Sequence, residues 1–158
     1  MIHLKEYKMD YSIIKDRLGP CGLHCGKCFA YIDGDIKSYS NKLKDSLGDF
    51  GVYANRFVDL INEPVFNKYK DFSELLTYFA SVDCAGCRKE KCKMFNDCKV
   101  RACYEKQGVD FCFQCSKFPC DNTGFDEHLH KRSIDINLRM CEIGVEKYYD
   151  EIKDKPRY

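Results

Sequence analysis

The sequence contains no long apolar run, and this absence excludes membrane-spanning proteins. No stretch approaches the ~18 consecutive apolar residues that a transmembrane helix needs. Charged side chains interrupt residues 1–18 repeatedly, so this segment does not have the apolar core of a signal peptide. We therefore expect a cytoplasmic protein that does not enter a membrane.

An excess of one charge is also missing. The 26 Lys and Arg residues and the 25 Asp and Glu residues give a net charge of +1, which provides no overall attraction to nucleic acid or to a membrane surface. The sequence also lacks a phosphate-binding glycine loop, a nucleophile elbow and a metalloprotease helix motif. It leaves open whether the protein is an enzyme and which partner it has, and a protein partner is compatible with it.

Cysteine, in contrast, is abundant. The 158 residues include twelve cysteines, and eleven of these fall in residues 21–28 and 84–120. Three pairs have Cys-x-x-Cys spacing, which lets two thiolates on one tight turn bind the same ion, as in tetrahedral zinc sites. Because a reducing compartment disfavours the disulfides of a secreted framework, we interpret these thiols as metal ligands. The predicted ligands are Cys21, Cys25, Cys28, Cys84, Cys87, Cys92, Cys98, Cys103, Cys112, Cys115 and Cys120.

The number of ligands sets the number of ions. Eight cysteines suffice for two tetrahedral zinc sites, and eleven with one histidine suffice for three. We predict two zinc ions, with three as the alternative. Turns that are close in the sequence are expected to share one ion, and the N-terminal turn to pair with the last Cys-x-x-Cys turn. The predicted groups are Cys84, Cys87, Cys98 and Cys103 for one ion and Cys25, Cys28, Cys112 and Cys115 for the other, with Cys21, Cys92 and Cys120 as alternates or members of a third site.

Three histidines and one cysteine lie close to these groups in the sequence. His24, between two cysteines, is either a ligand or an exposed loop residue. His128 and His130 follow the cysteine-rich segment, where they either complete a mixed site or give polar character to the start of a helix. Cys141 lies on a predicted apolar stripe and is expected to be a buried small side chain.

An iron–sulfur cluster is the main chemical alternative. The spacing of Cys21, Cys25 and Cys28 is the one with which radical S-adenosylmethionine enzymes hold a cluster, but no series of strands follows Cys28 to build their barrel. The second group of cysteines lacks the spacing of ferredoxins. Soft thiolates suit both zinc and iron–sulfur clusters, so a redox or electron-transfer protein stays the alternative to structural zinc binding.

Basic residues accompany the second cysteine group. Residues 84–120 contain eight Lys or Arg and four Asp or Glu, and we interpret the excess as neutralising thiolate charge. The alternative is a nucleic-acid-binding zinc module with aromatic stacking surfaces. No predicted helix has several basic residues on one face, so we favour a core role for the aromatic residues. The basic residues are Arg88, Lys89, Lys91, Lys93, Lys99, Arg101, Lys106 and Lys117, and the aromatic residues are Tyr104, Phe111, Phe113 and Phe118.

The segments without clustered cysteines predict helices. In residues 38–82, apolar side chains recur at helical spacing from Leu43 to Ile61. We expect one helix there, weakened by Gly48 and ended before Pro64.

Three further helices follow. One is expected to begin at Asp71 or Ser73. Residues 129–152 are again helical, with Gly144 as the break between two helices. The apolar stripe of this last part consists of Ile134, Leu138, Cys141, Val145, Tyr148 and Ile152.

The expected fold is α-rich, that is, mainly α with small irregular or short-ribbon elements. Residues 1–158 are predicted to form a single domain. Residues 21–28 and 84–120 make a zinc-stapled, metal-binding lobe, and residues 38–82 and 129–152 make the helical part.

Five segments of the chain form a combined cysteine pattern. They are Cys21-Gly-Leu-His-Cys-Gly-Lys-Cys-Phe-Ala-Tyr, Cys84-Ala-Gly-Cys87-Arg88, Cys98-Lys-Val-Arg-Ala-Cys103, Gly108-Val-Asp-Phe-Cys112-Phe-Gln-Cys115-Ser-Lys-Phe-Pro-Cys120 and Asn137-Leu-Arg-Met-Cys-Glu-Ile-Gly144-Val-Glu-Lys-Tyr-Tyr. Taken together, these segments resemble the prokaryotic domain-of-unknown-function family 3795. The resemblance implies a small, cysteine-rich protein that is presumed to bind metal, with no established activity. It also places Cys92 where the spacing varies within the family.

Overall fold

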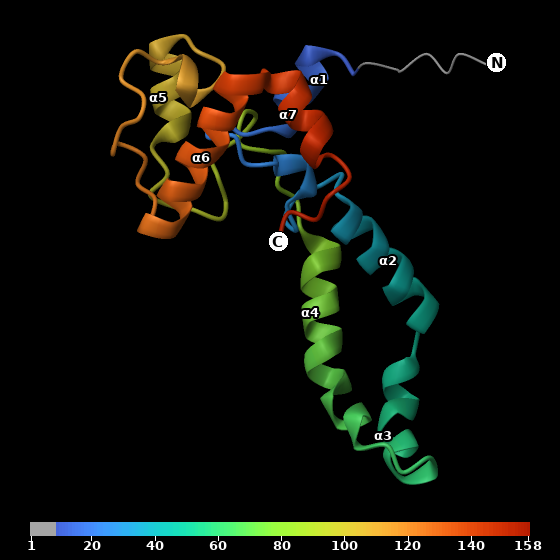
Figure 1. Ribbon diagram of the computed structural model, residues 1–158. Helices are drawn as coiled ribbons and strands as arrows, with labels where there is room; N and C mark the ends of the chain where they lie inside the picture. The colour runs from blue at the N-terminus through green and yellow to red at the C-terminus, as the bar shows by residue number, and fades with distance from the viewer. Residues whose placement is uncertain (1–8) are drawn as a thin grey trace, which may run out of the picture. The chain divides into compact units, whose positions relative to one another are not determined.

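The fold is helical in both of its parts. The computed structural model of the protein describes residues 9–158, in which seven α-helices and no strands are found (Figure 1). The expected α-rich class is therefore confirmed, while the expected ribbons are reduced to two isolated bridges within the described residues. The chain divides into two compact units: unit 1 combines the N-terminal residues up to 26 with residues 85–158, and unit 2 consists of residues 27–84. The expected single domain stays a prediction.

Unit 2 contains three α-helices, of which α2 (Asp35–Leu47) packs along α4 (Tyr69–Ser81). Between them, α3 (Phe50–Leu60) leads into the 3-10 helix η2 (Pro64–Lys68). The prediction of one continuous helix before Pro64 was wrong, because Gly48 takes a φ of +48° and ends α2. The expected helix start at Asp71 or Ser73 was also late, since η2 runs directly into α4.

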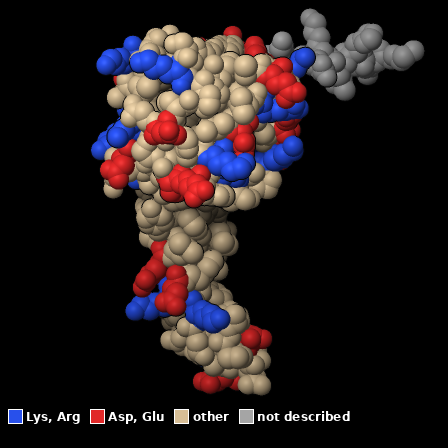
Figure 2. All heavy atoms as spheres, turned by 60° about the vertical axis from the view of Figure 1, so that its left-hand side comes forward, with Lys and Arg blue, Asp and Glu red and all other residues tan. Residues whose placement is uncertain are grey.

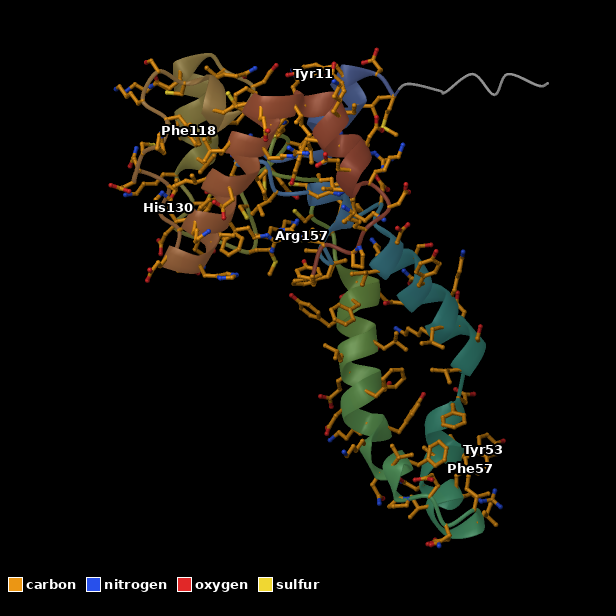
Figure 3. All side chains as sticks on the ribbon, in the orientation of Figure 1. Tyr11, Tyr53, Phe57, Phe118, His130 and Arg157 are labelled. Atoms are coloured by element: carbon orange, nitrogen blue, oxygen red, sulfur yellow. The ribbon has the colours of Figure 1, made fainter. Side chains whose placement is uncertain are left out.

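Aromatic rings fill the space between α3, η2 and α4. The ring centroid of Phe50 is 5.7 Å from that of Phe57 and 5.1 Å from that of Tyr69, and Phe57 is 5.6 Å from Phe66. Figure 3 labels Phe57 and, one turn earlier on the same helix, Tyr53, which is 50% exposed. Ring packing of this kind stabilises a small unit that buries few aliphatic side chains.

Unit 1 contains the largest group of fully buried side chains. Its helices are α1 (Tyr11–Arg17), α5 (Val100–Gln107), α6 (Glu127–Ile143) and α7 (Val145–Ile152). The predicted break at Gly144 is confirmed: its φ is +87°, and its N–H donates to the carbonyl of Met140. The core of this unit consists of Ile14, Leu18, Phe111, Met140, Val145, Tyr148 and Tyr149.

The buried face of α6 is not the predicted apolar stripe. Leu138 is 52% exposed and Cys141 is exposed, so the expectation that Cys141 is buried was wrong. The face that packs inward instead includes Ser133 and Asn137, together with Leu129 and Met140. The stripe was misplaced because two of the buried positions are polar, and hydrophobic periodicity does not register them.

Asn137 is buried because its amide joins two cysteine loops. Its Nδ2 donates to the carbonyl of Cys21 at 2.8 Å and to the carbonyl of Ser133 at 2.9 Å. Its Oδ1 accepts from the backbone N–H of Phe113 at 3.0 Å. The side chain is 1% exposed, so these bonds satisfy an amide that would otherwise be costly to bury.

We expect Asn137→Ala to lower the free energy of unfolding by about 2–4 kcal/mol. The substitution leaves the N–H of Phe113 and the carbonyl of Cys21 without their partner, at about 1–3 kcal/mol for each buried group. Urea denaturation followed by circular dichroism measures the change. The matched control is Leu138→Ala, on the exposed face of the same turn, which should change stability by less than about 0.5 kcal/mol. Equal effects of the two substitutions would contradict the bridging role of Asn137.

Candidate metal centre

The cysteines of the described chain are not joined in disulfides. In the described residues, no three or more His, Cys, Asp or Glu side chains are already arranged as an ion site. The structure does, however, gather the thiols of unit 1 into two groups. We call them the first and the second thiol group.

The first thiol group surrounds a small cavity. Tyr104, Val109 and Phe118 line the cavity together with the cysteines of this group, and the cavity has a volume of about 30 Å³. This is on the scale of one water molecule, so the space is sufficient for a single ion and too small for a metabolite. The group consists of Cys103, Cys112, Cys115 and Cys120.

Backbone hydrogen bonds hold the turn that carries two members of the first thiol group. The N–H of Cys112 donates to the carbonyl of Pro20 at 3.0 Å, and the N–H of Cys115 donates to the carbonyl of Cys112 at 3.1 Å. The Gln114 side chain accepts from the N–H of Phe111 at 2.9 Å. Burial raises the pKa of Cys112 to about 12, so a cation is needed to keep this sulfur as a thiolate at neutral pH.

Cys103 is the member of the first thiol group that lies on α5. Gly108 ends that helix with a φ of +64°, which turns the chain back toward Cys112. Cys120 is adjacent to α6, where the Nε2 of His130 lies 3.0 Å from the Cys120 carbonyl oxygen. Figure 3 labels His130 and, nearby, Phe118, which lines the cavity.

The second thiol group consists of Cys25, Cys87 and Cys92. Hydrogen bonding with Cys87 lowers the pKa of Cys25 and of Cys92, and the same interactions raise the pKa of Cys87. The three sulfurs thus act as one interacting set.

Arg88 positions the turn of the second thiol group. Its Nε donates to the carbonyls of Lys15 at 2.8 Å and Leu18 at 3.0 Å, and its Nη2 donates to the carbonyl of Asp110 at 2.6 Å. Its guanidinium also lies 4.8 Å from the ring centroid of Phe111. The sequence interpretation of Arg88 as a neutraliser of thiolate charge therefore missed this backbone-anchoring role.

Cys21 and Cys98 lie between the two groups. Cys21 is buried, with Cys98 and Cys112 packed against its cluster, and burial raises its pKa. Gly19 lies against these sulfurs: a Cβ at this position would be 3.3 Å from the Sγ of Cys21 and 3.6 Å from that of Cys25. The close approach explains why the chain carries glycine at this point.

The two remaining clustered cysteines belong to unit 2. Cys28 and Cys84 are buried there beside Ala30. The N–H of Cys84 donates to the carbonyl of Ala30 at 2.9 Å, and the N–H of Ile32 donates to the carbonyl of Cys84 at the same distance. These bonds hold Cys84 beside residues 30–32.

Cys103 lines one cavity with Cys112, Cys115 and Cys120, so the structure brings together one cysteine of the first predicted group and two of the second. Which cysteines share an ion stays a prediction. Among the histidines, His24 is 7% exposed, with its ring 5.4 Å from that of Tyr149 in an edge-on contact, whereas His128 is exposed. The interpretation of His24 as an exposed loop residue was wrong.

Gly124 joins the loops of Cys98 and Cys120. The N–H of Lys99 donates to the carbonyl of Thr123 at 2.9 Å. A Cβ at Gly124 would lie 2.0 Å from the carbonyl oxygen of Asp97, a backbone atom that cannot move aside alone. The two loops therefore approach closely only with glycine here.

We expect Gly124→Ala to be more destabilising than Gly108→Ala by about 1–3 kcal/mol, because only the former forces backbone atoms apart. Both glycines have positive φ, +72° and +64° respectively, and the space around Gly108 is open. The pair thus separates steric conflict from the left-handed backbone preference. Thermal and urea unfolding measure the difference. Equal losses would show that the loops do not pack as described.

Comparison with known proteins agrees with the cysteine pattern. The profile of a family described as "Protein of unknown function (DUF3795)" matches residues 17–125. The chain belongs to this family. The match covers all eleven clustered cysteines, and it confirms the family resemblance identified from the sequence motifs. No curated protein and no solved structure matches the chain.

Membership of this family fixes no activity. None of the helices in residues 9–158 combines the length and apolar character of a membrane span. On the face displayed in Figure 2, basic and acidic side chains are intermixed, so that face has no extended patch of one sign.

Proposed function

We propose that the protein is a cytoplasmic, structural zinc-binding protein and that its first thiol group is a zinc site. The observation that supports this most is the convergence of Cys103, Cys112, Cys115 and Cys120 on one cavity of about 30 Å³. Four thiols around a space of this size match the donor set of a closed structural zinc site.

A bound zinc ion would set the separation of the sulfurs. Sulfurs bound to one ion at about 2.3 Å in a tetrahedron lie about 3.8 Å from one another. The backbone turn that carries two of these cysteines is held by hydrogen bonds from the N–H of Cys112 to the carbonyl of Pro20 and from the N–H of Cys115 to the carbonyl of Cys112. Zinc would bind the cysteines as thiolates and release their protons. At Cys112, where burial raises the pKa of the thiol, the ion would supply the charge that stabilises the thiolate.

The energy of such a site is large for a chain of this kind. Zinc binding to small structural sites supplies roughly 10–16 kcal/mol, comparable with the whole net stability of a typical domain, about 5–15 kcal/mol. Apart from Cys84, residues 84–120 contribute only Val100 and Phe111 to the buried apolar side chains. An ion therefore supplies a stabilisation that apolar packing does not.

The alternatives make different use of the same residues. An iron–sulfur cluster would also be held by thiolates, and metal analysis decides between the two. Nucleic-acid binding through Phe111 is not proposed, because that ring is fully buried in the core of unit 1.

We expect anaerobically purified protein to contain about two zinc equivalents per chain, as the ligand count suggests. Cys115→Ser should remove about one equivalent and lower the melting temperature, because loss of one thiolate weakens a closed site and metal binding is coupled to folding. Elemental analysis and calorimetry measure the two effects. Cys141→Ser, which changes an exposed cysteine outside both thiol groups, is the control and should leave both unchanged.

Two results would contradict the proposal. Stoichiometric iron with acid-labile sulfide would replace zinc by a cluster. A Cys115→Ser variant with full zinc content and an unchanged melting temperature would exclude a structural role for the first thiol group.

A further inference from the structure

Unit 2 contains a cavity that has no part in the metal centre. It lies where four helical elements meet, because its lining residues come from the end of α2, the start of α3, η2 and the first turn of α4. Its volume is about 390 Å³, which falls within the range of about 300–1,000 Å³ for small-molecule sites. The apolar residues that line it are Leu47, Phe50, Val65, Phe66, Tyr69 and Phe72.

Packed aromatic rings form the wall of this cavity. The ring centroid of Phe50 lies 5.9 Å from that of Phe66 and 5.1 Å from that of Tyr69. The centroid of Tyr69 lies 6.0 Å from that of Phe72. Phe57, which Figure 3 labels, is in ring contact with Phe50 and Phe66. Because each ring is held by another, the wall is formed before a ligand arrives, and this lowers the cost of ordering side chains on binding.

The opening of the cavity leaves apolar side chains in contact with water. Val65 is 55% exposed and Phe72 is 42% exposed. Of the fifteen large apolar side chains that are exposed in residues 9–158, eleven belong to residues 27–84, so this exposure is a property of unit 2 and not of the whole chain. Exposed apolar side chains that gather around a formed cavity are typical of a binding site.

One charged side chain lines the cavity, and it is a cation. Lys68 is the last residue of η2, next to Tyr69. Within residues 9–158, its ammonium group makes no ion pair with a carboxylate. An ammonium group without a counter-ion, at the edge of an apolar surface, attracts an anion, and a carboxylate can pair with it through a charge-assisted hydrogen bond.

We propose that this cavity binds a small amphipathic monocarboxylate, a molecule with one carboxylate on a hydrocarbon body. The hydrocarbon body packs against the rings of Phe50, Phe66 and Tyr69, and the carboxylate pairs with Lys68. A phosphate ester fits less well, because the lining residues include a single cation. The site lies within unit 2 and uses none of the cysteines, so it is independent of the zinc proposal.

Isothermal titration calorimetry of the full chain with hexanoate, octanoate and octanol tests the proposal. Octanoate should bind at one equivalent per chain and about 10–20-fold more tightly than hexanoate, because two further methylene groups are buried. Octanol has the same chain length without the charge. It should bind about 2–5-fold more weakly than octanoate, which is the usual contribution of an exposed ion pair.

Three variants locate the site. Lys68→Met should reduce the affinity for octanoate to that for octanol and leave octanol binding unchanged. Val65→Asp should abolish octanoate binding, because it places a like charge on the apolar wall. Its matched control is Val52→Asp on α3, because Val52 is 70% exposed and does not line the cavity; this variant should bind octanoate as the unmodified protein does. Circular dichroism establishes that each variant is folded.

Each negative result contradicts a different part of the proposal. Absence of octanoate binding to the unmodified protein would overturn the site, and so would octanoate binding that persists in Val65→Asp. Equal affinities for octanoate and octanol, or an unchanged octanoate affinity in Lys68→Met, would overturn the pairing of the carboxylate with Lys68. The zinc content of the protein is measured separately, and none of these results bears on the proposed function.

Discussion

The arrangement of unit 1 depends on a single buried amide. Asn137 receives the N–H of the loop that carries Cys112 and Cys115 and donates to the carbonyl of Cys21. Two loops that are 92 residues apart in the chain, from Cys21 to Phe113, are thereby fixed to one helix. Cysteine loops have little regular structure of their own, so a polar side chain on a rigid helix is an effective way to set their separation. The apolar core around Met140 surrounds this amide and excludes the water that would compete for its bonds.

Two arginines extend the same principle to other segments. Arg88 bonds to carbonyls of the N-terminal segment, and Arg157 bonds to the carbonyl of His24. Arginine suits this use, because one planar group presents several donors to carbonyls that have left regular helices. The positive charge of residues 84–120 thus has a structural component as well as an electrostatic one. Composition alone reports the total charge and does not separate these two uses.

Much of the helical content could be predicted from the sequence, because helical periodicity is a local signal. The break at Gly144 was predicted for the same reason, whereas the break at Gly48 was underestimated as a mere weakening. The buried face of α6 could not be found by hydrophobicity, since Ser133 and Asn137 lie on it. The grouping of the thiols depends on contacts such as those of Arg88 with Lys15 and Leu18. These join positions about 70 residues apart and leave no periodic trace in the sequence.

The division of the chain also determines the order in which the units can be completed during synthesis. All of unit 2 lies in residues 27–84, so its helices emerge from the ribosome together and can pack while translation continues. Unit 1 contains the segment before residue 27, yet the partners of that segment include Asn137 and Arg157. The first cysteine loop is therefore synthesised long before the residues that hold it in place. During that interval the loop lacks the hydrogen bonds that Asn137 and Arg157 make to it in the folded chain.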